Sequence, residues 1–227
     1  MSIDKFVNKV VLGDCMEIMK GIPDNSVDFV ITDPPYGIIG DKLKWDDIEL
    51  EKFTRQWFEL AKKKSKGFLV FWSQKYIELG YKIFNPDRML IWWHPNLQKP
   101  TNKMYLWSYD PIFFIRGKVF NGNFSRGLNA DVKNYAIPQS NFTVDPKVHE
   151  TQKPLQLLKD LVEVNTNEGD TVLDPFVGSG TTCVAAKILR RRYIGIEQQQ
   201  KYVDIALGRL SGRMENTDTK QESLFLE

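Results

Sequence analysis

Short apolar runs alternate with stretches of helical periodicity along most of this chain, and no other feature of the sequence constrains the fold as strongly. The apolar runs lie at residues 9–12, 26–32, 67–73, 89–93, 111–117, 170–174 and 192–197. Helical patterns occupy residues 15–21, 50–63, 154–165, 179–190 and 200–210, and Asp14 is the expected N-cap of the first of these helices. Strands that alternate with helices build parallel sheets covered on both faces. We therefore expect an α/β fold with a largely parallel sheet.

The chain has 227 residues and is 42% hydrophobic, which is enough for one domain with a sizeable core. We expect this domain to span residues 1–210. Periodicity disappears between residues 118 and 148, so a small insertion is expected at about 117–148. Residues 211–227 are mostly polar and are expected to form a flexible tail.

Several classes of protein are disfavoured by composition. No run of 18 apolar residues occurs, and the first ten residues lack the apolar core of a secretory signal, so we expect a cytoplasmic protein without membrane contact. Cys15 and Cys183 lie in segments predicted to be structured, and neither His94 nor His149 has a second ligand at helical spacing. We therefore expect neither a disulfide framework nor a metal site.

The charge is distributed unevenly. The net charge of +2 does not predict a nucleic-acid partner by itself, but residues 98–147 carry seven cations and only three anions. The same segment contains Asn, Gln, Tyr and Trp side chains suited to bases and phosphates. An ordinary solvated surface is the alternative, and we keep the segment as a candidate DNA-facing surface.

The stretch VDFVITDPPYG ends a buried-looking strand in a stiff elbow. Pro34 and Pro35 remove two backbone donors and fix two φ angles, between the carboxylate of Asp33 and the ring of Tyr36. A simple turn after a strand is the alternative interpretation. The elbow would present one acid and one aromatic face in a rigid arrangement.

The stretch TVLDPFVGSGTT places Gly178 and Gly180 between a strand and a helix, where backbone N–H groups can approach a ligand closely. A phosphate-binding loop of the GxxxxGK[ST] type is excluded because no lysine follows the glycines. Asp174 leads the loop and suits a cationic or hydroxyl-bearing ligand. Glu197 ends the next strand, 23 residues further on, at the spacing of a carboxylate that binds ribose hydroxyls.

DPFVGSGTT together with TDPPYG resembles the β class of DNA amino-methyltransferases, in which the catalytic motif precedes the cofactor loop. GDCMEIMKGIPDNSVDFVITDPPYG and HETQKPLQLLKDLVEV resemble further blocks of this class in the same order, so the resemblance covers most of residues 8–210. It implies a class I, Rossmann-like fold with a mostly parallel seven-stranded sheet, the last strand antiparallel and helices on both faces. It also implies S-adenosylmethionine as the cofactor.

The resemblance assigns roles to individual positions. Glu197 would bind the cofactor's ribose, Asp14 would face its adenine, and Lys153 would lie near its methionine moiety, unless Lys153 is only a surface cation beside a helix start. The full cofactor set implied is Asp14, Lys153, Asp174, Pro175, Phe176, Gly178, Ser179, Gly180, Thr181 and Glu197. The implied catalytic set is Asp33, Pro34, Pro35 and Tyr36.

The elbow suits transfer of a methyl group to an exocyclic amine. The lone pair of such an amine is delocalised into the ring, and two rigid acceptors, the Asp33 carboxylate and the Pro34 carbonyl, would draw it out. Tyr36 would stack on the base, which must leave the duplex to reach the pocket. In the family, Asp at the first motif position favours N6 of adenine, so we expect adenine, with N4 of cytosine as the alternative.

The expected insertion at 117–148 stands where this class places its target-recognition segment. Its short length predicts either a short recognition sequence or a homodimer that presents two segments on double-stranded DNA. Candidate DNA contacts are Lys99, Lys103, Arg126, Asn129 and Lys133. The tail residues Gln221, Ser223, Leu224 and Phe225 resemble the peptide that docks replication proteins onto the bacterial sliding clamp. Packing of Leu224 and Phe225 on the body is the alternative.

Two other functions remain as alternatives: a methyltransferase for a glutamine side chain or an RNA base, and a DNA-binding relic without activity. The order of the motifs and the presence of Asp rather than Asn at position 33 argue against the first. The intact Asp33, Tyr36, Gly178 and Glu197 argue against the second.

Overall fold

The computed structural model describes residues 2–36, 50–96, 108–121, 128–139, 147–149 and 151–212. The strands are β1 (Lys9–Leu12), β2 (Phe29–Thr32), β3 (Phe68–Phe71), β4 (Arg88–Trp93), β5 (Tyr109–Ile115), β6 (Val132–Asn134), β7 (Thr171–Asp174) and β8 (Arg192–Glu197). The α-helices are α1 (Cys15–Lys20), α2 (Leu50–Lys64), α3 (Ile77–Phe84), α4 (Leu155–Asn165), α5 (Thr181–Ile188) and α6 (Gln200–Leu210). Two 3₁₀ turns, η1 (Ile3–Lys5) and η2 (Gln74–Tyr76), complete the described elements.

The strands form one sheet in the order β1-β8-β7-β2-β3-β5-β4-β6. β5 runs antiparallel to both β3 and β4, while the other described pairs are parallel. The expected α/β class is therefore confirmed. The implied strand count was wrong by one, because β6 adds an eighth strand at the edge, and the antiparallel strand is β5 rather than the last one.

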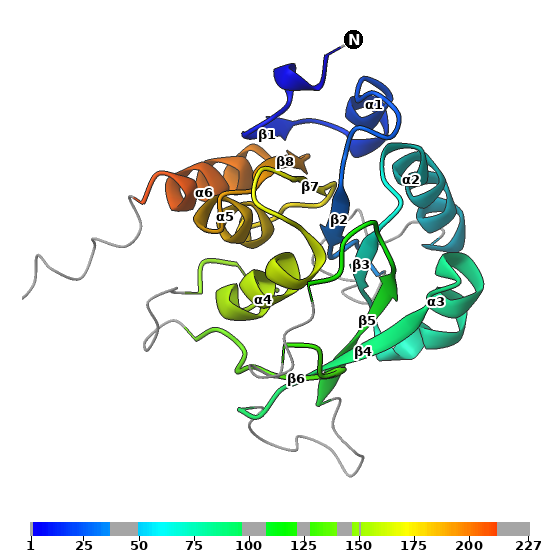
Figure 1. Ribbon diagram of the computed structural model, residues 1–227. Helices are drawn as coiled ribbons and strands as arrows, with labels where there is room; N and C mark the ends of the chain where they lie inside the picture. The colour runs from blue at the N-terminus through cyan, green and yellow to red at the C-terminus, as the bar shows by residue number, and fades with distance from the viewer. Residues whose placement is uncertain are drawn as a thin grey trace, which may run out of the picture.

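Helices cover both faces of the sheet. Figure 1 shows α4, α5 and α6 on one face and α1, α2 and α3 on the other. Side chains alternate between the two cores: Phe29 and Ile31 of β2 join the core beneath α4 and α5, whereas Val30 joins the core beneath α1 and α2. Strands buried on both faces need apolar residues at every position, which explains their continuous hydrophobic runs.

The sequence patterns predicted neither helix α3 nor strand β6. Gly80 interrupts the helical pattern of α3, because glycine disfavours helices. A Cβ at this position would lie 2.1 Å from the Phe113 ring, so packing against β5 requires glycine there. The three residues of β6 include two polar ones, and they pair with Ile91 to Trp93 of β4.

Two further boundaries bear on the expectations. Helix α4 begins at Leu155, one residue later than expected, and Pro154 occupies its N-cap position. Helix α6 ends at Leu210, and residues 213–227, with the whole predicted clamp peptide, lie outside the described residues. No helix in the described ranges is long and apolar enough to cross a membrane.

Candidate active site

The site lies where β2 and β7 end side by side. These two strands pair in parallel, and the chain leaves β2 toward β3 on one side and leaves β7 toward β8 on the other. Open parallel sheets bind ligands in the crevice at such a reversal of strand order. A cavity of about 310 Å³ opens here, lined by residues of the elbow, the glycine loop, the end of β8 and the segment before α4.

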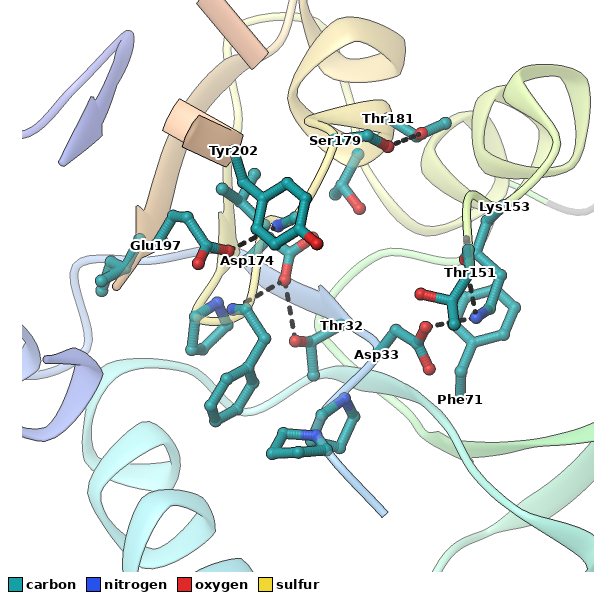
Figure 2. A pocket seen from close by; sticks show the side chains of 18 of the residues that line it. Thr32, Asp33, Phe71, Thr151, Lys153, Asp174, Ser179, Thr181, Glu197 and Tyr202 are labelled. Carbon is teal, nitrogen blue, oxygen red and sulfur yellow. Dashed lines mark hydrogen bonds and ion pairs between the residues drawn. The ribbon is translucent and has the colours of Figure 1, made fainter. Parts of the chain in front are cut away.

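The acid that leads the glycine loop is buried and hydrogen-bonded. Asp174 Oδ1 accepts the hydroxyl of Thr32 at 2.8 Å and the backbone N–H of Phe176 at 3.1 Å (Figure 2). Burial raises the pKa of Asp174 to about 6, against the opposing effect of hydrogen bonds that include those from Thr182 and Thr32. Asp174 therefore combines a preorganised position with a carboxylate that titrates just below neutral pH.

The two loop glycines serve different purposes. Gly178 lines the cavity with a φ of +49°, while Gly180 does not line it. A Cβ on Gly180, whose φ is +86°, would lie 2.8 Å from the Cβ of Ala206. Gly180 therefore permits a tight turn and close packing on α6 rather than contact with a ligand.

Ser179 and Thr181 line the cavity, and their hydroxyls are hydrogen-bonded to Arg209 of α6. They lie 3.3 Å apart, and both accept hydrogen bonds from one guanidinium nitrogen of Arg209, at 3.1 and 2.8 Å. The same nitrogen donates to the Ser179 carbonyl at 2.8 Å. Arg209 thus ties α6 to the loop, and its helical sequence pattern contained no signal of this role.

Glu197 holds the other side of the loop. Its Oε2 accepts the N–H of Gly178 at 3.1 Å and its Oε1 accepts the N–H of Gln199 at 2.9 Å. Burial raises the pKa of Glu197, and these backbone hydrogen bonds oppose the increase. Figure 2 shows the carboxylate in the same cavity as Asp174.

Asp14 does not line the cavity. Its Oδ1 caps α1 by accepting the N–H groups of Met16 and Glu17, and its Oδ2 accepts the amide of Gln198 at 2.9 Å. The predicted helix cap is confirmed. The neighbouring Cys15 and Gln198 line the cavity in its place.

The proline elbow forms the wall opposite the loop. Asp33, Pro34, Pro35 and Tyr36 all line the cavity, and Tyr36 packs edge-on against Trp72 with 5.4 Å between ring centroids. The Oδ1 atom of Asp33 is buried and has no hydrogen-bond partner among the described residues. Buried polar atoms are normally paired, so this acceptor is suited to a donor on a ligand.

The other oxygen of Asp33 binds Lys153. The ammonium group donates to Asp33 Oδ2, and Figure 2 shows the two side chains pointing toward each other beside Phe71. Burial raises the pKa of Asp33, and the charge of Lys153 opposes the increase. The structure therefore brings together a predicted catalytic residue and a predicted cofactor residue that lie 120 positions apart in the chain.

His149 and Tyr202 also line the cavity and were missed as site residues. Their ring centroids lie 4.4 Å apart, and His149 approaches Gly178. Thr32, which supports Asp174, was missed as well. His149 stands in a block that was recognised, HETQKP, but its chemistry alone did not assign it a role.

Of the five predicted DNA contacts, the structure describes two. Lys99, Lys103 and Arg126 lie outside the described residues. Lys133 is 5% exposed and donates to the backbone carbonyl of Leu128, and burial lowers its pKa. A lysine that is buried in this way and bonded to the backbone is not an exposed contact for DNA. Asn129 is half-buried nearby.

A sequence model of the DNA methylase family, described as N6/N4 methylases, matches residues 27–208. This chain belongs to that family. The expected β-class resemblance is thereby confirmed, and so is the expected cofactor, since members of the family take their methyl group from S-adenosylmethionine.

Individual DNA methylases are similar over most of the chain. The type II methyltransferase M.HinfI of Haemophilus influenzae is 29% identical over 250 residues, which cover 92% of this chain and 70% of the relative. The structure of M1.HpyAVI with S-adenosylmethionine superposes with a TM-score of 0.67 at 24% identity, over 89% of this chain and 98% of that one. The cytosine-N4-specific PvuII methyltransferase gives a TM-score of 0.72 at 19% identity, over 88% and 85%.

Proposed function

We propose that this methylase transfers the methyl group of S-adenosylmethionine to N6 of an adenine that has been flipped out of double-stranded DNA. The observation that carries the proposal is the buried Oδ1 of Asp33, which has no hydrogen-bond partner within the described ranges and belongs to a cavity shared with Asp174 and Glu197. The acceptor for the amine, Asp33, and the residues proposed to hold the nucleoside of the cofactor, Asp174 and Glu197, thus line the same cavity.

The residues of the cavity fit the cofactor. S-adenosylmethionine supplies an electrophilic sulfonium methyl group when bound. Glu197 offers a carboxylate for the ribose, Asp174 offers a negative charge for a cationic ligand, and Phe176 offers an apolar surface beside them. A cavity of about 310 Å³ is at the lower end of the usual size of ligand pockets.

The elbow supports the chemistry at the amine. Positive charge grows on the nitrogen as the methyl group arrives, and an ionised Asp33 stabilises that charge. The carbonyl of Pro34 is the second acceptor, held in place by the fixed φ angles of the two prolines. Rigid acceptors cost no reorganisation during the reaction, so positioning of amine and methyl group would supply much of the acceleration.

Base flipping follows from the depth of the site. Asp33 lies inside the cavity at 21% exposure of its side chain, which a base stacked in a duplex cannot reach. Tyr36, the last residue of the elbow, lines the cavity and offers a ring for stacking.

Adenine is the preferred base because Asp occupies the first position of the elbow motif. Methylation of cytosine N4 is the alternative outcome, since one structural neighbour is named as specific for that position.

The test is methyl transfer from tritiated S-adenosylmethionine to duplex DNA, followed by nucleoside digestion and mass spectrometry. We expect methyladenine with the wild-type chain and none with Asp33→Ala. Methylcytosine would support the alternative base. Transfer to RNA or to a glutamine-containing peptide, with DNA left unmodified, would refute the proposal.

Two partner proposals rest on the sequence. A short recognition segment fits either a short recognition sequence or two copies of the chain on one DNA site. We propose the second, for which analytical ultracentrifugation with a DNA duplex should show a dimeric complex. The tail with Gln221, Leu224 and Phe225 is proposed to bind the bacterial sliding clamp. Equal retention of the full chain and of a chain lacking residues 221–227 on immobilised clamp would contradict the second proposal.

A further inference from the structure

The contact between Lys153 and Asp33 joins a loop that precedes α4 to the end of β2. The Lys153 ammonium donates to Asp33 Oδ2 and, more distantly, to the Thr151 carbonyl at 3.4 Å. Only 11% of the Lys153 side chain and 21% of the Asp33 side chain are exposed. The pair is therefore largely shielded from the solvent that would weaken it.

The surroundings of the ammonium group are specific. Lys153 Nζ lies 5.2 Å from the centroid of the Phe71 ring and 5.9 Å from that of Trp92. Aromatic faces attract cations at such distances. Pro154 restricts the backbone of the residue before it, and Gln152 is buried and accepts the N–H of Val148. The lysine thus extends from a segment that is anchored on both sides.

We infer that Lys153 is a positioning residue: it holds Asp33 ionised and turns the carboxylate so that Oδ1 remains free for the amine of the target base. The inference rests on the proposed function and deepens it. Because Lys153 occupies only Oδ2, its contact with Asp33 is compatible with an amine on Oδ1, to which no described residue donates a hydrogen bond.

The charges around Asp33 explain why a cation is needed. Burial raises the pKa of Asp33, and Asp110 of β5 raises it further. Asp174 of β7 is the other acid nearby, and the charge of Asp33 contributes to the raised pKa of Asp174. Lys153 is the cation that opposes these effects among the described groups acting on Asp33. A protonated Asp33 would stabilise the developing positive charge on the amine poorly.

The first experiment measures kcat for DNA methylation between pH 5 and 9 with both substrates saturating. Activity should require ionised Asp33, so it falls as the pH drops below the pKa of this group. Lys153→Met removes the opposing charge and should move the acidic limb of the profile upward by about one pH unit or more. Lys153→Arg should keep the limb close to that of the wild type.

Lys159→Met is the matched control. Lys159 stands on α4 six residues further on, and its ammonium contacts Gln156 at 3.3 Å, away from the cavity. This variant should leave the limb in place. If Lys153→Met raises the KM for S-adenosylmethionine while the acidic limb stays where it is, the lysine binds the cofactor instead and the inference is wrong.

A second experiment does not depend on activity. The carboxyl carbon of Asp33 is followed by ¹³C NMR during a pH titration, with Asp33→Asn used to assign the signal. We expect the midpoint in Lys153→Met to lie higher than in the wild type by about one unit or more. An unchanged midpoint overturns the inference even if the wild-type chain methylates DNA. A raised midpoint in a chain that does not methylate DNA supports the pairing and refutes only the proposed function.

Discussion

Thr32 and Asp174 lie 142 residues apart, and the hydroxyl of Thr32 donates to Asp174 Oδ1 over 2.8 Å. Thr32 is the last residue of β2, directly before the proline elbow, and Asp174 is the last residue of β7, directly before the glycine loop. This hydrogen bond therefore connects the two halves of the site at the point where they meet.

Replacement of Thr32 by valine should weaken both the fold and the site. The change keeps the shape but removes a buried hydrogen bond to a carboxylate, so we expect a loss of about 1.5–3 kcal/mol in the free energy of unfolding. The pKa of Asp174 should rise further because this hydrogen bond lowers it. Urea unfolding measures the first effect, and calorimetric binding of S-adenosylhomocysteine shows whether the site suffers too.

Thr54→Val is the matched control for that experiment. Thr54 is fully buried on α2, and its hydroxyl has no partner within the described part of the chain. Its replacement should be neutral or stabilising. Equal destabilisation by the two valines would mean that the bond to Asp174 contributes nothing.

Asp174 should make stability depend on pH. Its pKa is about 6 in the folded chain against a reference of 3.8, so the folded state binds more protons than the unfolded state between these values. The contribution of this group to stability is fully present below about pH 4 and is lost as the pH rises through about 6. A shift of this size corresponds to about 3 kcal/mol.

Asp174→Asn should remove this dependence. The free energy of unfolding of the variant minus that of the wild type should increase between pH 4 and pH 7, by up to about 3 kcal/mol. Urea titrations at several pH values measure the difference, in which the contributions of other groups cancel. A constant difference across this range would show that Asp174 does not titrate there.

Glu197→Gln should weaken cofactor binding. The neutral amide keeps one acceptor for the loop but loses the charge-assisted bonds, so we expect a loss of about 1.5–3 kcal/mol, or roughly 10- to 100-fold in affinity for S-adenosylhomocysteine. Calorimetry gives the affinity. Glu168→Gln serves as the control because the pair of Glu168 with Arg190 is exposed and should matter little. If Glu197→Gln binds S-adenosylhomocysteine as tightly as the control variant does, Glu197 does not contribute to cofactor binding.

Gly180→Ala should destabilise the protein for two separable reasons. The residue has a φ of +86°, and an added Cβ would meet Ala206 at 2.8 Å. Gly169 has nearly the same φ, +84°, and no atom of the described residues would lie within 4 Å of an added Cβ. Gly169→Ala should therefore cost about 1–2 kcal/mol from backbone strain alone, and Gly180→Ala about 1–3 kcal/mol more from the clash. Equal costs in urea unfolding would show that packing on α6 is not what requires this glycine.

Local patterns predicted much of the framework. β1, β8 and α6 have the bounds expected from their apolar runs and helical spacing, and Asp14 caps α1 as expected. These features depend on residues within a few positions of one another, which is the range that periodicity and capping chemistry describe.

Contacts between distant segments were decided only in the folded chain. The pairing of Lys153 with Asp33, the support of Asp174 by Thr32, and the contact of Arg209 with the glycine loop depend on the order of strands in the sheet. Lys133 looked like a DNA contact because charge usually lies at the surface, yet β6 carries it into the protein.

The sequence by itself thus determined which residue types stand at the end of each strand, because strand ends and turns follow from neighbouring residues. The tertiary structure decided which of those ends become neighbours and which of their polar atoms stay unpaired. That choice depends on packing two hydrophobic cores against opposite faces of one sheet, and no short segment contains the information.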